Sequence, residues 1–462
     1  MRRSVAVLFT ILFLGDLLFL YKLSNRPVVP AFRTSSSHLH ASKLGSLALG
    51  VSLLLALVSV AARRRRRSAA RSEFPFFNHK GPVYLDSAAT TQKPKIVVDA
   101  ISDFYFRHSA NVHRSGHSLG DAATSAYEES RKKLGKFFGT SENNVVITRG
   151  ATASLNDLAR AFERVVHPGD KIVISEAAHS SNFLPWSALA KKTSADLVVL
   201  PALASECEIL AMIDSRVKLV AVPHVSHVFG SEFPINQISH KLKQVAPEAF
   251  LVVDGCQAAG HLIPWASDAV DAYVVSGHKM CGPTGVGATY ISDRLKKAIG
   301  NFSLGGGTVD SFDKHGNFIL SSFPYAFEAG TPPIAEAVGL GVAGEFLRGR
   351  RAEVTAREES LRQYLEQQVR EIEGVELLSD EFQRVIPLVS LKFTDVNVAD
   401  VAALISDRVC VRTGVHCAAP LHAAVGANAG SLRLSLGFYN SRAEVSLAVD
   451  AIRCALAILR NV

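Results

Sequence analysis

Cysteine is scarce in this chain, and its spacing excludes several kinds of site. The 462 residues contain six cysteines, at positions 207, 256, 281, 410, 417 and 454. No two of them form a CxxC pair, and none has the spacing of a zinc finger, so we expect no metal site. A chain of this length does not depend on a disulfide scaffold, and a reducing compartment is the simpler expectation. Most of these thiols are expected to be small buried residues, although each is a candidate nucleophile.

Acidic residues are nearly absent from the start of the chain. The first 72 residues contain twelve Lys or Arg and one acidic residue, Asp16, which gives this segment a net charge of +11. The whole chain has a net charge of +8, so the remaining 390 residues carry −3. The basic character therefore belongs to the leader. The body lacks the positive charge that nucleic-acid binding requires, and we expect no nucleic-acid partner.

Residues 1–72 are interpreted as a targeting leader. Met1-Arg2-Arg3 and the apolar run from Val5 to Gly15 are typical of a signal peptide. The stretch from Arg26 to Lys43, rich in Ser, His and Arg, has the composition of a transit peptide. The next nineteen residues, Leu44 to Ala62, are uncharged and long enough to cross a bilayer, and five arginines follow them.

This order of segments resembles the leaders that carry proteins into complex plastids, such as apicoplast-like organelles. A plastid location is therefore expected, with the leader contacting a membrane. The alternatives are a membrane anchor on the secretory pathway and a mitochondrial location.

From about residue 80, short apolar runs alternate with stretches of helical periodicity. Runs of this kind suit strands that are buried on both faces, and helical spacers between them predict a parallel α/β sheet. The predicted strands of this sheet are Val145–Thr148, Lys171–Ile174, Leu197–Leu200, Leu219–Val222, Leu251–Val253, Ala272–Val275 and Val286–Tyr290.

The pattern changes toward the C-terminus. The charged segment Arg348–Glu371 predicts a solvated helix, and a capping box of Ser441 and Glu444 predicts the start of the last helix. Between them, strands are predicted at Val375–Leu378, Ile386–Phe393, Val409–Val411 and Ser431–Leu436. We expect a leader (1–72), a large domain (80–340) and a smaller α+β domain (341–462).

The decapeptide Ser276–Gly285 lies between two predicted strands and contains Lys279. Lysine is rarely buried unless it is paired or used. A lysine between two buried strands is a candidate for Schiff-base chemistry, which exploits the ease with which a buried amine loses its charge. The alternative is a surface turn with the charge in water, and the decapeptide alone leaves both interpretations open.

Polar residues follow several of the predicted strands, where ligands of such sheets bind. Taken singly, each has an ordinary explanation as a helix cap or an interior histidine. Together they comprise a phosphate cradle, an imidazole, an acid and an amine, a set that suits pyridoxal phosphate. The residues are Gly150-Ala151-Thr152, His179, Asp254, Gln257, Ser276, His278 and Lys279.

Five longer motifs carry a family resemblance. They are Tyr84–Pro94, Asn111–Arg114, Ser276–Lys279, Phe327–Pro332 and Arg412–Pro420. Because it contains these five motifs, the chain resembles the pyridoxal-phosphate-dependent cysteine desulfurases of the SUF (sulfur-mobilisation) type, a group within the class V aminotransferase family. The resemblance extends from Val83 to the end of the chain. The resemblance implies fold type I of these transferases. In that fold a large domain with a mainly parallel seven-stranded sheet is followed by a smaller C-terminal α+β domain with the catalytic cysteine loop.

The resemblance also implies roles for individual residues. Lys279 would hold the cofactor aldehyde and move the Cα proton, and Cys417 would be the nucleophile that receives sulfur. Arg433, helped by Arg412, would bind the substrate carboxylate with its planar fork. On the cofactor ring, Asp254 would contact the nitrogen, Gln257 and His227 the hydroxyl, and His179 the face. The phosphate would be bound by Ala151, Thr152, Ser276, His278 and Thr331. Of these, Thr331 would come from a second subunit.

Three positions depart from the family pattern. His227 stands where asparagine is usual, Ala151 replaces a threonine, and Val415 replaces one histidine of a pair before the cysteine. The imidazole of His227 can also donate a hydrogen bond, as asparagine does. Near the nucleophile, the positive charge of His416 and Arg412 is expected to favour a Cys417 thiolate.

The expected activity is conversion of L-cysteine to L-alanine, with the sulfur left as a persulfide on Cys417 for iron–sulfur cluster assembly. A homodimer, a persulfide-acceptor protein and an iron–sulfur scaffold are the implied partners. The alternatives are a selenocysteine lyase, a transaminase or kynureninase-like enzyme, and a cofactor-binding scaffold that has lost catalysis.

Overall fold

The computed structural model describes residues 70–262, 264, 269–378 and 382–461. Residues Arg67–Val462 form one compact unit. The signal, transit and hydrophobic segments predicted in the leader lie outside the described residues. Among the residues that the structure does describe, no helix combines the length and the apolar character needed to cross a membrane.

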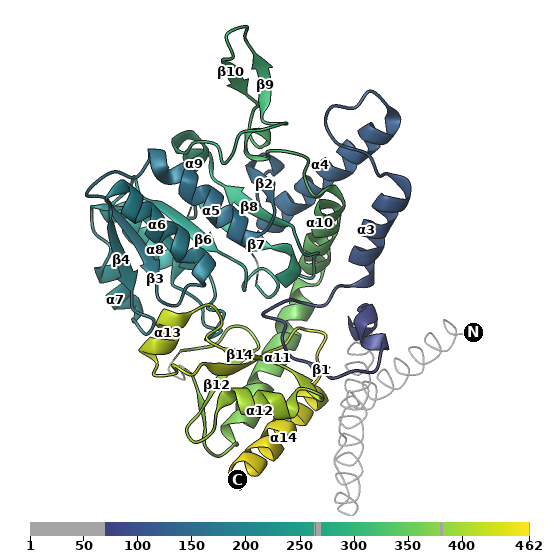
Figure 1. Ribbon diagram of the computed structural model, residues 1–462, viewed down its shortest axis with the longest axis vertical. Coiled ribbons are helices and arrows are strands. Elements are labelled where there is room, and N and C mark those ends of the chain that lie inside the picture. Colours follow the sequence, from purple (N-terminus) through teal and green to yellow (C-terminus); the bar gives the residue numbers. More distant parts are fainter. Residues whose placement is uncertain (1–69, 263, 265–268, 379–381, 462) are drawn as a thin grey trace, which may run out of the picture. The chain divides into compact units, whose positions relative to one another are not determined.

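A seven-stranded sheet forms the centre of the larger part of the molecule (Figure 1). All pairs are parallel except those of β8, which runs antiparallel to both of its neighbours. The mainly parallel seven-stranded sheet predicted from the sequence is therefore confirmed, and each predicted run forms one of its strands. In spatial order they are β2 (Val145–Thr148), β8 (Gly287–Ile291), β7 (Ala272–Ser276), β6 (Phe250–Asp254), β5 (Val217–Pro223), β3 (Lys171–Ser175) and β4 (Asp196–Leu200).

Helices cover both faces of this sheet, because alternate residues of each strand point to opposite sides. In β6, Leu251 and Val253 belong to one hydrophobic core, whereas Phe250 and Val252 belong to the other. The first core is covered by α3 (Lys95–Arg107), α4 (Ser118–Phe138), α7 (Glu206–Ala211), α8 (Ile235–Val245) and α10 (Ile334–Gly349). The second core is covered by α5 (Ala151–Ala161), α6 (Leu184–Thr193) and α9 (Asp293–Ala298).

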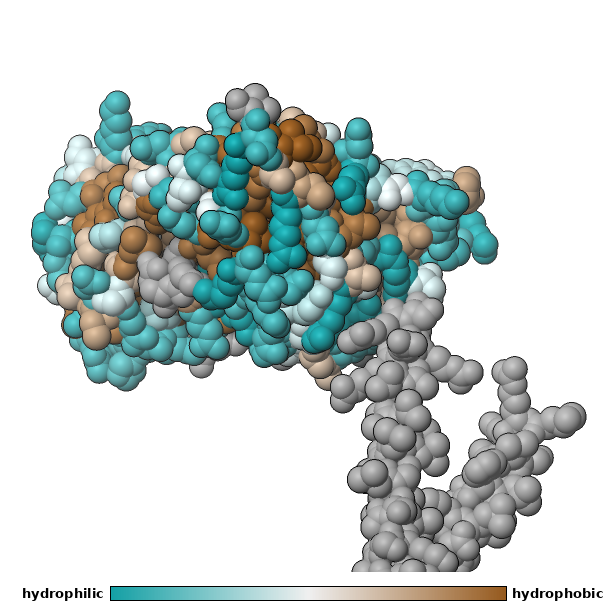
Figure 2. Space-filling model, turned by 90° about the horizontal axis from the view of Figure 1, so that it is seen from below, coloured by the Kyte–Doolittle hydropathy of each residue, from teal (hydrophilic) through white to brown (hydrophobic). Residues whose placement is uncertain are grey.

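A second, four-stranded antiparallel sheet lies in the lower part of Figure 1. Its spatial order is β11 (Val375–Leu377), β12 (Leu388–Phe393), β15 (Ser431–Ser435) and β14 (Arg412–Gly414). A third core joins it to α11 (Arg351–Arg370), α12 (Val398–Ile405) and α14 (Arg442–Leu459). The face of the molecule seen from below in Figure 2 is largely hydrophilic, with hydrophobic groups visible between the hydrophilic ones.

The N-terminal arm of the body contacts this smaller part. The strand β1 (Val83–Tyr84) pairs in parallel with β13 (Val409–Cys410), and Leu85 belongs to the third core. Residues placed at the start of the predicted large domain thus pack on the C-terminal part of the chain. The domain boundaries themselves stay predictions.

Candidate active site

The strands of the large sheet end at one edge of a cavity of about 260 Å³. β6 ends at Asp254, and β7 ends at Ser276, directly before a 3₁₀ turn, Gly277–Lys279. Parallel neighbours present their carboxyl ends at the same edge, which brings these side chains together. All of the site residues predicted from the sequence line this cavity except Thr331 and Gly150, the residue directly before α5.

The peptide bond before Lys279 is held by an unusual number of donors. The carbonyl oxygen of His278 accepts hydrogen bonds from Thr91 N (2.9 Å), Thr90 Oγ1 (3.1 Å), Thr91 Oγ1 (3.1 Å) and Lys93 Nζ (3.1 Å). Lys279 itself is half-buried, and its Nζ has no ion-pair partner among the described residues. The backbone is therefore fixed while the amine remains available to bind an aldehyde.

Asp254 is a buried carboxylate whose side chain pairs with no cation in the described part of the chain. It is 7% exposed, and its Oδ1 accepts a hydrogen bond from Cys256 N (3.0 Å). A buried carboxylate without a cationic partner is costly. The protonated ring nitrogen of pyridoxal phosphate would supply that partner, so this end of the cavity fits the cofactor.

The other end of the cavity presents the N-terminus of α5, which suits an anion. Gly150 has a φ of 118°, and a Cβ atom at Gly287 would lie only 2.7 Å from Gly150 Cα. This close approach brings Ala151 N within 2.9 Å of Ser276 Oγ, to which it donates. Thr152 Oγ1 and a neighbouring hydroxyl, Ser181 Oγ, lie 2.8 Å apart. Hydroxyls and a helix N-terminus thus converge where a phosphate would bind.

Two histidines of the cavity are neutral at neutral pH. Burial and the nearby charge of Lys279 lower the pKa of His179, whose Nδ1 accepts a hydrogen bond from Ser181 N (3.0 Å). The same two causes lower the pKa of His278 to about 4. His179 is therefore an uncharged ring suited to stacking, and His278 can contribute a hydrogen bond but no charge to a phosphate.

His227 and Gln257 both make contacts that the sequence did not predict. Gln257 Nε2 donates to Ala88 O (2.8 Å), and His227 Nε2 donates to His416 O (2.8 Å). Burial, followed by the proximity of His179, holds the pKa of His227 well below its ordinary value. Since the neutral ring has one N–H and a carbonyl takes it, the other nitrogen, Nδ1, is an acceptor. This differs from the expected donation to a cofactor hydroxyl.

Arg433 and Arg412 share one carboxylate, Asp86. Arg433 is 3% exposed; its Nη1 donates to His227 O (2.9 Å), and its Nη2 lies 3.5 Å from Asp86 Oδ1. Arg412 Nη2 donates to Asp86 Oδ2 (3.3 Å). Burial lowers the pKa of Arg433 to about 10, so the guanidinium remains charged at neutral pH. Its Nε is buried and has no hydrogen-bond partner in the described chain, so these contacts leave one donor of the fork unused.

Sequence reasoning assigned no role to Asp86, although the residue lies within the motif Tyr84–Pro94. Its two arginine partners follow it by more than 300 residues, so only the folded chain reveals the pairing. An acidic residue inside a motif rich in small side chains was the available signal.

Cys417 lies in the short loop between β14 and α13 (Ala419–Ala424) and is exposed. It lines the same cavity as Lys279, although the two are 138 residues apart. Burial and the charge of Arg433 lower the pKa of His416 to about 3, so His416 is uncharged. The expectation that His416 contributes positive charge to Cys417 is therefore wrong, and of the two predicted sources only Arg412 remains.

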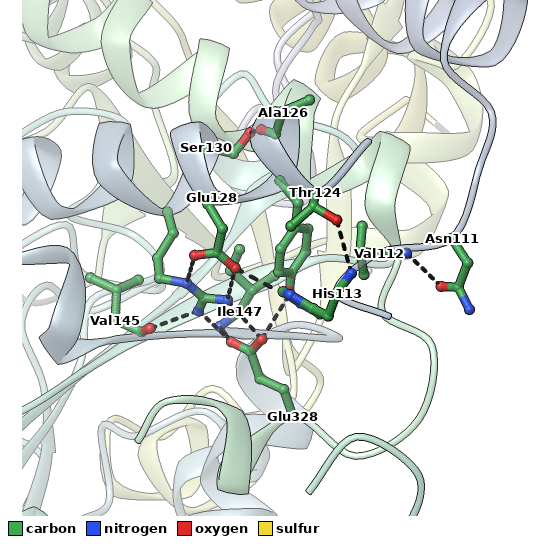
Figure 3. A network of polar contacts seen from close by, with 12 residues as sticks. Asn111, Val112, His113, Thr124, Ala126, Glu128, Ser130, Val145, Ile147 and Glu328 are labelled. Carbon is green, nitrogen blue, oxygen red and sulfur yellow. Dashed lines mark hydrogen bonds and ion pairs between the residues drawn. The ribbon is translucent and has the colours of Figure 1, made fainter. Parts of the chain in front are cut away.

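Thr331 lies outside the cavity and is exposed, next to two other hollows lined in part by Asn111. Its segment is anchored by Glu328, which accepts hydrogen bonds from Arg131 Nη2 (2.9 Å) and from Ile147 N (2.7 Å). Figure 3 labels Glu328 and Ile147 within this network of polar contacts. A single chain therefore does not bring Thr331 to the cofactor cavity, and its contact from a second subunit stays a prediction.

Comparison with known proteins agrees with this geometry. The aminotransferase class-V model matches residues 83–447. A probable cysteine desulfurase of Vibrio cholerae is 38% identical over 405 residues, which cover 85% of this chain and 98% of the relative. A cysteine desulfurase of Haloferax volcanii is 35% identical over 385 residues, covering 81% and 89%.

Two solved structures are similar to most of this chain. The cysteine desulfurase of Thermococcus onnurineus has a TM-score of 0.80 and 31% identity, covering 86% of this chain and 98% of its own. The cysteine desulfurase CsdA of Escherichia coli has a TM-score of 0.77 and 32% identity, covering 85% and 99%. The chain therefore belongs to the pyridoxal-phosphate-dependent aminotransferase class-V family.

Proposed function

We infer that the protein is a pyridoxal-phosphate-dependent cysteine desulfurase, which converts L-cysteine to L-alanine and leaves the sulfur on Cys417. The observation that carries this inference is the presence of Cys417 and Lys279 in one cavity, with Arg433 beside them. A lysine alone would suit many enzymes that use this cofactor. A cysteine at the same cavity supplies the acceptor that sulfur transfer requires.

Pyridoxal phosphate, when bound, supplies an electron sink at the substrate Cα. Asp254 would pair with its ring nitrogen, His179 would lie on its ring, and the start of α5 with Ser276 would bind its phosphate. Lys279 Nζ would bind the aldehyde and then carry the proton of the substrate Cα. Arg433 would hold the substrate carboxylate in place through its guanidinium.

Cys417 would complete the reaction as a thiolate that attacks the substrate sulfur. The S–S bond forms as the carbon–sulfur bond breaks, and the electron pair of the broken bond stays with the carbon fragment. A proton then converts that fragment to alanine. The overall change, from L-cysteine and a thiol to L-alanine and a persulfide, balances without an external oxidant or reductant.

The test is to incubate the purified body, loaded with pyridoxal phosphate, with cysteine and to measure alanine and sulfide. We expect alanine in the wild type and its loss in Cys417→Ala. Full turnover by Cys417→Ala would favour a transaminase or kynureninase-like reaction instead. Repeating the assay with selenocysteine distinguishes a desulfurase from a selenocysteine lyase.

We further propose assignment to the SUF type and transfer of the persulfide to an acceptor protein that serves iron–sulfur assembly. The exposure of Cys417 supports this, because a protein acceptor must reach its sulfur. The test is to mix the persulfidated enzyme with small thiol-bearing proteins and to follow labelled sulfur.

A homodimer is proposed on the position of Thr331. This residue is exposed and borders a hollow of about 370 Å³ that Tyr105 also lines, and on α3 Tyr105 is 55% and Phe106 86% exposed. Burial of these aromatic side chains by a second copy would stabilise a dimer. Light scattering of the wild type and Phe106→Glu tests the proposal, since the variant is expected to be monomeric.

A plastid location is proposed from the leader alone. Residues 1–72 fused to a fluorescent reporter are expected to direct it to a membrane-bounded plastid. A signal confined to the cytosol would contradict this, and a mitochondrial or secretory-membrane signal would support one of the alternatives.

A further inference from the structure

The Cys417 loop has a backbone conformation that needs support from its surroundings. His416 and Cys417 both lie in the left-handed region, with φ values of 50° and 59°. Non-glycine residues are strained in this region and persist only where neighbouring contacts favour them. The contacts that hold these two residues therefore decide where the Cys417 thiol lies.

Three successive carbonyl groups of the loop accept hydrogen bonds. His416 O accepts from His227 Nε2 (2.8 Å), and Cys417 O accepts from both N and Oγ of Ser180 (2.8 Å each). Ala418 O accepts from His422 Nδ1 (3.0 Å). His422 belongs to the loop's own helix, whereas His227 and Ser180 follow strands of the large sheet. These two residues thus join the cysteine loop to the part of the chain that forms the cofactor cavity.

His227 has the more buried contact of the two. It is 4% exposed, and its ring lies 5.1 Å from the ring of His179. Its own carbonyl oxygen accepts the hydrogen bond from Arg433 Nη1 (2.9 Å). One residue therefore contacts the groups proposed to stack on the cofactor, to bind the substrate carboxylate and to carry Cys417.

We propose that His227 is a positioning residue for Cys417, and that its Nε2–H group fixes the left-handed loop through the His416 carbonyl. The role rests on the proposed function, because Cys417 is taken as the sulfur acceptor. This role requires a hydrogen-bond donor at the same distance from the backbone as Nε2 of histidine. Glutamine places an amide nitrogen at about that reach, whereas the shorter asparagine places its amide near the position of Nδ1.

This difference in reach defines the experiment. The holoenzyme is prepared as wild type, His227→Gln, His227→Asn and His227→Ala, with His240→Asn, an exposed histidine of α8, as the matched control. Hydrogen exchange of peptides spanning residues 412–420 reports on the loop, and the persulfide formed on Cys417 in a single turnover reports on sulfur transfer. Cofactor absorbance verifies that each variant is folded and loaded.

We expect the Asn and Ala variants to exchange about 5- to 100-fold faster in this loop, which corresponds to loss of one buried hydrogen bond. Their single-turnover persulfide should fall in parallel, while hydrogen exchange in the Gln and His240→Asn variants remains within about twofold of wild type, well below the change expected for a lost bond. Equal exchange in the Gln and Asn variants would overturn the proposal.

Two further outcomes are also decisive. If the Asn and Ala variants do not bind cofactor, Ser180→Ala serves in their place, because it removes only the hydroxyl donor to Cys417 O. Unchanged exchange in that variant would overturn the account of the loop. Absence of persulfide in the wild type would refute the proposed function, whereas the exchange comparison would still decide whether His227 anchors the loop.

Discussion

Asp86 Oδ1 lies 3.5 Å from Nη2 of Arg433, the arginine proposed to bind the substrate carboxylate. The two side chains are 14% and 3% exposed, so a carboxylate from the N-terminal arm neutralises a nearly buried cation of β15. The same carboxylate holds Arg412 through its other oxygen. Asp86 thus pairs with both arginines and orients them before any substrate binds.

Replacing Asp86 by asparagine is expected to destabilise the protein by about 3 kcal/mol, because it leaves a buried guanidinium without a counter-charge. Urea unfolding of the wild type and the variant measures this. Asp395→Asn is the control, since Asp395 pairs with Arg460 at the surface, where water screens the pair, and this substitution should cost much less. Similar losses in the two variants would contradict the account.

Replacing Arg433 by lysine keeps the charge but removes the planar fork. We expect the KM for cysteine to rise by about 10- to 100-fold, the equivalent of one charged hydrogen bond, with an unchanged cofactor spectrum. Arg412→Lys is the comparison, because Arg412 is half-exposed and should have a smaller effect. Steady-state kinetics decide, and an unchanged KM in Arg433→Lys would exclude Arg433 as the carboxylate-binding residue.

The pH dependence of stability tests the environment of Lys93. Burial lowers the pKa of Lys93 from its ordinary value of 10.5 to about 8. Between pH 8 and 10.5 the unfolded chain binds more protons than the folded chain. The free energy of unfolding should therefore rise with pH in this window, by at most about 1.4 kcal/mol per pH unit.

The measurement compares wild type with Lys93→Met by urea unfolding at pH 7, 8, 9 and 10. The contributions of other groups cancel in the difference between the two proteins. That difference should be constant below pH 8 and should then move in favour of the wild type. A difference that stays flat up to pH 10 would show that burial does not lower the pKa of Lys93.

The ion pair of Arg131 and Glu328 anchors the segment that carries Thr331. Glu328→Gln preserves the shape of the side chain but leaves a nearly buried cation with a weaker partner, and should cost about 3 kcal/mol in urea unfolding. Glu345→Gln, which breaks the more exposed pair with Lys133, should cost less than about 1 kcal/mol. If both substitutions cost the same, the buried pair has no special role in stability.

Much of the fold could be predicted from local patterns. The seven apolar runs of the large sheet are nearly continuous because both faces are covered by helices, and such runs are easily recognised. The capping box of Ser441 and Glu444 is present, and Val445, Val449, Ile452 and Leu456 are buried on one face of α14. These features depend only on residues close together in the chain.

Two elements were not predicted in full, for physical reasons. The hairpin of β9 (Val309–Phe312) and β10 (Phe318–Leu320) projects at the top of Figure 1, and its side chains are mostly exposed, so no burial pattern marks it. The charged helix α11 was expected to be solvated. It buries Leu361, Leu365 and Glu358, and Glu358 pairs with His261 at 2.8 Å.

For the site, too, some features could be predicted from local sequence and others could not. The residues at the strand ends could be grouped from sequence because parallel strands end at one edge of a sheet. The contact of His227 with His416 spans 189 residues and depends on a left-handed loop, neither of which leaves a local pattern. The neutral state of His416 likewise results from burial, which only the folded chain determines.

The most direct test of the account is the mass of the Cys417 peptide after the holoenzyme reacts with one equivalent of cysteine. The account predicts a peptide heavier by one sulfur atom, lost on treatment with a reducing agent, together with an equivalent amount of alanine. Alanine formed without added sulfur on Cys417, or formed equally well by Cys417→Ala, would contradict it.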